Sequence, residues 1–273
     1  MTEPRRFPRR RLRRRRRRQD RRAIYLLPNL LTTASLLLGF GSLVQASQGH
    51  FGTAALAIVL AGVFDMLDGR IARATHSTSQ FGLEYDSIVD MVSFGVAPAF
   101  LIYTWTLAPL GPRGWLVAAL FAVCAALRLA RFNVQQQSEE STRYRGLPST
   151  FAGGFVAVTV WFVEWSGLTP PLPRMVGLVL TAGFSGLALL MVSSIPYPSP
   201  KGVRLTGRQG FSVLVVAAVA LVVILLHHEP VMFGLGLIYV LSGPVLWILE
   251  SPARSRKREL EASRPEESHG DAG

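Results

Sequence analysis

Eight apolar segments, each long enough to cross a bilayer, limit what this chain can fold into. Because a bilayer offers no water to the backbone, such a segment must satisfy its own amides and carbonyls, as a helix does. Short connections rich in Gly, Pro and Ser favour antiparallel neighbours in one bundle. We therefore expect an all-α integral membrane protein of about eight transmembrane helices. The segments are residues 30–47, 51–73, 86–107, 114–133, 150–166, 174–195, 211–228 and 231–249.

The distribution of positive charge predicts how these helices are oriented. If the N-terminus is cytoplasmic, only Arg113 and Arg174 of the 29 Lys and Arg residues lie outside, which leaves 29 − 2 = 27 inside. This division follows the positive-inside rule. The sequence therefore predicts a multi-pass protein of the cell membrane, in which each even-numbered helix ends in the cytoplasm.

The arginine-rich segment at residues 1–23 has no apolar periodicity, and we expect it to be disordered in isolation. It fixes the N-terminus in the cytoplasm and would also adhere to anionic membrane lipid. It lacks the aromatic or structured residues that accompany nucleic-acid binding, so no nucleic-acid partner is expected. Alternatively, the arm and residues 30–46 are a signal peptide cleaved after the small residues Val44 and Ala46.

Four aspartates interrupt the second and third expected helices. An aspartate within a bilayer costs several kcal/mol unless it is paired or bound to a cation, so this cluster indicates a function. Both acidic helix ends lie on the cytoplasmic side and are joined by the short loop ATHSTSQF, at 74–81. The four residues are Asp65, Asp68, Asp86 and Asp90.

Small residues share the faces that carry these acids. Gly69 and Ala72 fall within an arc of roughly 100° that also holds the first acidic pair, and Gly82 is one turn before the second pair. Without His or Cys, such a set favours hard cations such as Mg²⁺ or Mn²⁺. Two of these ions, roughly 4 Å apart, can clamp a diphosphate, and Arg73 can reach a phosphate.

Two other interpretations use the same acids. Ion pairs of Asp65 or Asp68 with neighbouring arginines would only hold helices together, which gives no reason for small residues on the acidic face. A cation transporter also uses buried aspartates, but it would usually show interrupted helices and internal repeats. The sequence shows neither of these features.

The acids belong to the pattern DxxDGxxAR, eight residues, GxxxDxxxD, which begins at Asp65. This pattern resembles the signature of the CDP-alcohol phosphotransferase family, in which a CDP-linked lipid or alcohol donates a phosphoryl group to a hydroxyl and CMP leaves. The resemblance implies a six-helix catalytic bundle, two divalent ions and a homodimer. It implies metal binding by Asp65, Asp68 and Asp86, a general base with a possible metal role at Asp90, and CDP binding by Gly69, Ala72, Arg73 and Gly82.

Other stretches resemble the branch of this family that uses serine, which implies CDP-diacylglycerol and L-serine as substrates and phosphatidylserine and CMP as products. The chain departs from that branch at Pro196, where a basic residue is common, and at 149–151, where small apolar residues usually follow the GLP. Glycerol phosphate, inositol phosphate and choline are alternative acceptors, and a lipid-binding scaffold is an alternative of another class. The stretches are VSFGVAPAF (92–100), RLARFNV (128–134), RGLPST (145–150) and MVSSIPYPSPK (191–201).

Cationic side chains outside the motif are candidates for binding the carboxylate of serine or a lipid phosphate. Arg128 and Arg131 could act as forks at the end of the fourth helix, or could simply snorkel to the interface. Arg145 and Lys201 are further candidates in cytoplasmic loops. Ser93, about one turn beyond Asp90, could orient that acid or bond its own helix.

The resemblance covers roughly residues 24 to 208, and this sets the expected domain organisation. The active site should face the cytoplasm, where serine and CMP are soluble. The expected parts are a disordered arm at 1–23, a catalytic core at 24–208, two additional transmembrane helices at 209–250 and a cytoplasmic tail at 251–273.

Overall fold

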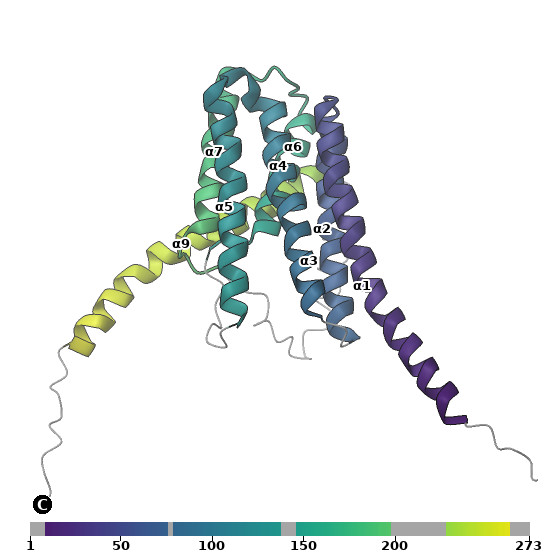
Figure 1. The fold of residues 1–273 in the computed structure, drawn as a ribbon. Coiled ribbons are helices and arrows are strands. Elements are labelled where there is room, and N and C mark those ends of the chain that lie inside the picture. The colour runs from purple at the N-terminus through teal and green to yellow at the C-terminus, as the bar shows by residue number, and fades with distance from the viewer. Residues whose placement is uncertain (1–8, 76–78, 138–145, 198–227, 263–273) are drawn as a thin grey trace, which may run out of the picture.

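The computed structural model describes residues 9–75, 79–137, 146–197 and 228–262. Its elements are helices that stand side by side, except for the last, α9, which crosses the bundle obliquely (Figure 1). They are α1 (Arg9–Ser47), α2 (Phe51–Ala74), α3 (Gln80–Asp90), η1 (Met91–Val96), α4 (Ala97–Ile102), η2 (Tyr103–Leu107), η3 (Ala108–Leu110), α5 (Pro112–Gln137), α6 (Ser149–Trp165), α7 (Arg174–Val192) and α9 (His228–Ala262).

Six helical stretches in the described residues are long and apolar enough to cross a membrane, and α6 is a shorter apolar helix of 17 residues. The expected all-helical membrane architecture is confirmed at this level. The expected span at 211–228 lies outside the described residues, so the count of eight stays a prediction. The six stretches are Leu27–Ser47, Phe51–Ala74, Gln80–Leu110, Pro112–Gln135, Arg174–Val192 and Glu229–Leu249.

The third helix begins earlier than the apolar pattern predicts. It starts at Gln80 because Ser79 caps it, with the Ser79 Oγ accepting a hydrogen bond from the Gly82 amide at 3.0 Å. The expected start at residue 86 is therefore wrong. The helix then continues through the π-helical turns η1 and η2 to Leu110, and both of its aspartates lie inside it instead of at its start.

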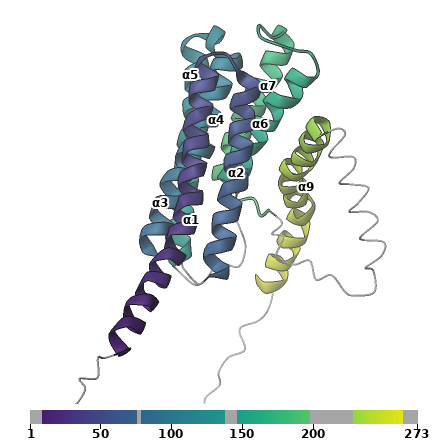
Figure 2. The ribbon, with the colours of Figure 1, turned by 90° about the vertical axis from the view of Figure 1, so that its right-hand side faces the viewer.

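The first two helices form one side of the bundle, and α1 extends well beyond it at its N-terminal end (Figure 2). α3 and α6 run in the same direction. The α6 residue Glu164 lies near Gly52, at the start of α2, whereas the start of α3 lies near the end of α2. α9 contacts the bundle mainly through α6, where Phe162 and Phe233 stack at 4.4 Å between ring centroids.

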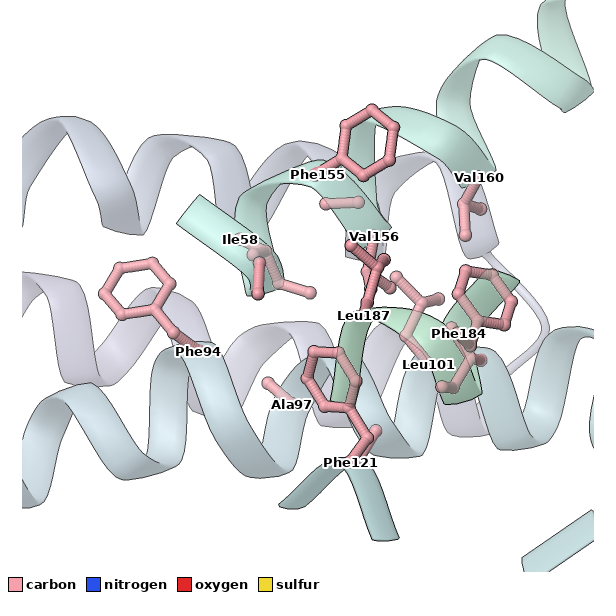
Figure 3. Close-up of a cluster of buried hydrophobic side chains, with 14 of the residues drawn as sticks. Ile58, Phe94, Ala97, Leu101, Phe121, Phe155, Val156, Val160, Phe184 and Leu187 are labelled. Carbon is pink, nitrogen blue, oxygen red and sulfur yellow. The ribbon is translucent and has the colours of Figure 1, made fainter. Parts of the chain in front are cut away.

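Buried apolar side chains from several helices meet along the middle of the bundle (Figure 3). Because lipid tails are as apolar as leucine, such helices associate mainly through close packing rather than by expelling water. The packing side chains include Ile58 of α2, Leu101 of α4, Phe121 of α5, Val156 of α6 and Leu187 of α7. This core lies deeper in the bundle than the end of α2 and the start of α3, where the aspartates are. Packing in the core fixes the positions of these two helices.

A close backbone contact joins α6 to η1 at Gly153. A Cβ at this position would lie 2.6 Å from the carbonyl oxygen of Phe94 and 2.8 Å from its Cα, whereas a Cβ at Gly154 would meet nothing within 4 Å. We expect Gly153→Ala to lower the thermal midpoint clearly, at a cost of about 1–3 kcal/mol, because backbone atoms must separate. Gly154→Ala is the matched control and should unfold like the wild type. Equal midpoints for the two variants in detergent would contradict this contact.

Candidate active site

Three of the four aspartates present their carboxylates to one point between α2 and α3. One carboxylate oxygen each from Asp65, Asp68 and Asp86 lies within 4.8 Å of the others. Asp68 is only 5% exposed. Since α2 ends and α3 begins at this level, the helix pair brings together acids that are far apart on the extended chain.

Asp90 adds a fourth carboxyl, one turn beyond Asp86. It lies in hydrogen-bond contact with the carboxyl of Asp65, and its other neighbours include Asp86 and Asp68. Its Oδ1 is buried and has no hydrogen-bond partner among the described residues. Carboxylates packed this closely repel one another unless a cation or proton lies between them.

The donor set fits divalent metal ions. Carboxylate oxygens are the ligands that Mg²⁺ and Mn²⁺ prefer, and neither His nor Cys belongs to the cluster. The unpartnered Asp90 Oδ1 is an additional oxygen ligand that the protein itself leaves unused. The cluster can therefore hold such an ion, with the carboxyl of Asp90 beside it.

The small residues beside the acids leave the backbone of α2 accessible. A Cβ at Gly69 would meet only the guanidinium of Arg73, at 3.6 Å, so that side chain lies over a bare turn of helix. Ala72 is half-buried next to it. Gly82 is more confined, because a Cβ there would lie 3.1 Å from Ser79 Oγ and 3.5 Å from Asn29 Oδ1. The open surface thus lies mainly on α2.

Residues of α1 complete the site, and the motif alone does not reveal them. Thr32 Oγ1 donates to Asp68 Oδ2 at 2.6 Å, and the Thr33 hydroxyl is 3.0 Å from that of Tyr85 on α3. These bonds tie α1 to both acidic helices. The sequence feature that could have identified them is a set of polar residues within an apolar helix, namely Asn29, Thr32, Thr33 and Ser35.

The candidate anion-binding arginines have different surroundings. Arg128 is 8% exposed, its Nε donates to the Leu147 carbonyl at 2.9 Å, and its guanidinium lies 5.4 Å from the centre of the Phe132 ring. Arg131 donates from Nη1 over longer distances, 3.4 Å to the Val192 carbonyl at the end of α7 and 3.5 Å to the Ser193 carbonyl. Arg145 and Lys201 lie outside the described residues.

Ser93 serves neither of its expected roles. Its hydroxyl donates to the carbonyl of Ser35 on α1 at 3.1 Å, so it neither orients Asp90 nor bonds its own helix. The close approach of α1 explains this contact, since a Cβ at Gly39 would collide with the Ser93 side chain. Asn133 makes the corresponding link from α5, donating to Ser87 Oγ on α3 at 2.9 Å.

Comparison with known proteins points to one family. Residues 25–242 match the family described as CDP-alcohol phosphatidyltransferase. The CDP-diacylglycerol–serine O-phosphatidyltransferase of Helicobacter pylori is 37% identical over 232 residues, which cover 82% of this chain and 92% of the relative. The proteins of the same name from Mycobacterium tuberculosis and Bacillus subtilis are 32% and 30% identical, over 72% and 63% of this chain and 69% and 89% of their own lengths.

Proposed function

The chain belongs to the CDP-alcohol phosphatidyltransferase family, and from this we propose that it transfers the phosphatidyl group of CDP-diacylglycerol to L-serine, giving phosphatidylserine and CMP. It is thus a multi-pass membrane transferase of phospholipid biosynthesis. The observation that carries the proposal is the convergence of Asp65, Asp68 and Asp86 around a point that suits a divalent cation, beside the bare turn at Gly69.

Asp65, Asp68 and Asp86 would hold the metal, with Asp90 contributing to a second ion. Bound Mg²⁺ or Mn²⁺ would neutralise the diphosphate and stabilise charge on the entering and leaving oxygens. The Thr32 hydroxyl fixes the carboxylate of Asp68, which is a way to orient a ligand before substrate arrives.

Asp90 is the proposed general base. An alcohol is a poor nucleophile until a positioned carboxylate accepts its proton, and Asp90 Oδ1 is buried and available to do so. The serine oxygen then forms a bond to the lipid-side phosphorus, the bond from that phosphorus to the bridging oxygen breaks, and CMP leaves. The proton ends on Asp90 and is lost when products depart.

The remaining residues would bind the two substrates. The open turn at Gly69 and Ala72, with Arg73 above it, suits the close approach of the CDP phosphates. Gly82, one turn before Asp86 on α3, is a further candidate for this contact. Arg128 is already oriented by Leu147 and Phe132, so it is the preferred partner for the carboxylate of serine. Arg131, Arg145 and Lys201 stay weaker candidates. We also propose a cytoplasmic active site, on the charge distribution, and a homodimer.

The experiment that tests this function measures CMP release and lipid product with purified protein. The protein is incubated with CDP-diacylglycerol, Mg²⁺ or Mn²⁺, and separately with L-serine, glycerol phosphate, inositol phosphate and choline. We expect CMP and phosphatidylserine with L-serine, and at most traces of product with the others. Product with another alcohol alone would replace the acceptor, and no CMP with any acceptor would refute the transfer reaction.

A further inference from the structure

Two buried polar atoms that have no hydrogen-bond partner in the described part of the chain lie at the same level of neighbouring helices. One is Asp90 Oδ1, on α3, and the other is the hydroxyl of Ser149, the first residue of α6. Ser149 is 1% exposed. A buried hydroxyl that makes no hydrogen bond costs roughly 1–3 kcal/mol, so it calls for an explanation such as a ligand.

The contact between Gly153 and Phe94 fixes the relative height of the two atoms. These residues touch through their backbones, and their helices run in the same direction. Ser149 precedes Gly153 by four residues, and Asp90 precedes Phe94 by four, which is about one turn on each helix. Because both residues lie one turn before the same contact, Ser149 is at the same depth in the bundle as Asp90, at the end that holds the candidate active site.

The segment before Ser149 is held in place by the neighbouring helices. Gly146 has a positive φ of 84° and donates its amide to the Ile195 carbonyl at 2.9 Å, while the Leu147 amide donates to Leu190 at 3.0 Å. A Cβ at Gly146 would lie 2.4 Å from the Met191 carbonyl oxygen, so only glycine fits. Arg128 binds the Leu147 carbonyl. Ser149 therefore follows a fixed turn, and the buried guanidinium of Arg128 binds to that same turn.

We propose that the Ser149 hydroxyl binds the carboxylate of the amino-acid acceptor, together with Arg128, and so helps select serine over simple alcohols. This inference rests on the proposed function. Ser149 begins a helix, whose first amides have no intrahelical acceptor and add positive potential at the same place. With its carboxylate held at Ser149 and Arg128, the acceptor lies beside Asp90, which takes the proton from its hydroxyl.

The test is Ser149→Ala, with Michaelis constants measured separately for L-serine and CDP-diacylglycerol. Loss of a hydrogen bond to a charged group should raise KM for L-serine roughly tenfold or more. KM for CDP-diacylglycerol should stay within a factor of two. Ser149→Thr, which keeps a hydroxyl, should restore much of the affinity for serine. The thermal midpoint of Ser149→Ala without serine should be no lower than that of the wild type, because its hydroxyl bonds nothing among the residues that the structure describes.

Ser42→Ala is the matched control. Ser42 on α1 also has a buried hydroxyl that finds no partner in the described ranges, but it lies two turns beyond Ser35, away from the acids. It should leave both Michaelis constants unchanged. An unchanged KM for L-serine in Ser149→Ala would overturn the inference while wild-type CMP release with serine still supports the proposed reaction. A variant that unfolds at lower temperature would assign Ser149 a structural role instead and would equally overturn it.

Discussion

Asp90→Asn should lower kcat by about a thousandfold while the protein still binds CDP-diacylglycerol. The amide keeps the size of the side chain but cannot accept the proton of the acceptor hydroxyl, and a positioned base contributes roughly 10²–10⁴ to rate. The fold should survive, because Asp90 Oδ1 has no partner in the described residues whose bond would be lost. Single-turnover CMP release, with nucleotide binding measured in parallel, separates the two effects.

Glu84→Gln provides the control for this substitution. Glu84 is an exposed carboxylate on the same helix, and it is not among the acids that face the metal position. Exchanging it for the amide should leave kcat and nucleotide binding as in the wild type. An Asp90→Asn enzyme that turns over at the wild-type rate would remove Asp90 as the base, whatever its role in binding ions.

Removing divalent metal with a chelator should abolish CMP release, by a factor of at least about a thousand, and adding Mg²⁺ or Mn²⁺ should restore it. The four clustered acids repel one another without a cation, and the diphosphate would add further negative charge at the same place. For the same reason, metal alone should raise the thermal midpoint of the chelated protein. The midpoint is followed against metal concentration without substrates.

Asp68→Asn should lose most of this metal-dependent stabilisation together with the activity, because it removes one of the three converging carboxylates. Glu164→Gln is the comparison variant. Glu164 is half-buried in the same bundle but lies at the opposite end of α6, beside Gly52. It should keep the full metal response. If Asp68→Asn responds to metal like the wild type, the ion lies elsewhere.

Much of this architecture follows from hydropathy and spacing, because both depend on local sequence. The apolar segments agree with the ends of the six described spans to within three residues, except at the start of the third helix. The motif from Asp65 to Asp90 identified the acids that the structure brings together. The start of the third helix was missed because a cap depends on a single side chain, Ser79, and not on apolar periodicity.

Contacts between distant helices could not be predicted in this way. Nothing in the local pattern pairs Thr32 with Asp68, or sends the Ser93 hydroxyl to the Ser35 carbonyl, because both depend on how closely α1 approaches its neighbours. The same holds for the role proposed for Ser149, which rests on its lack of a partner among the described residues. Sequence periodicity predicts which face of a helix is buried. Predicting which side chains bond across two helices also requires the relative heights of those helices in the bundle.

The bond from Thr32 to Asp68 has a consequence for biosynthesis. A protease that cut after Ala46 would discard the first helix, and with it the hydroxyl that bonds the proposed metal ligand Asp68, so such a cut would cost the site this contact. During translation the first helix emerges before the acids do. The bond between Thr32 and Asp68 can therefore form only after the second helix has been made.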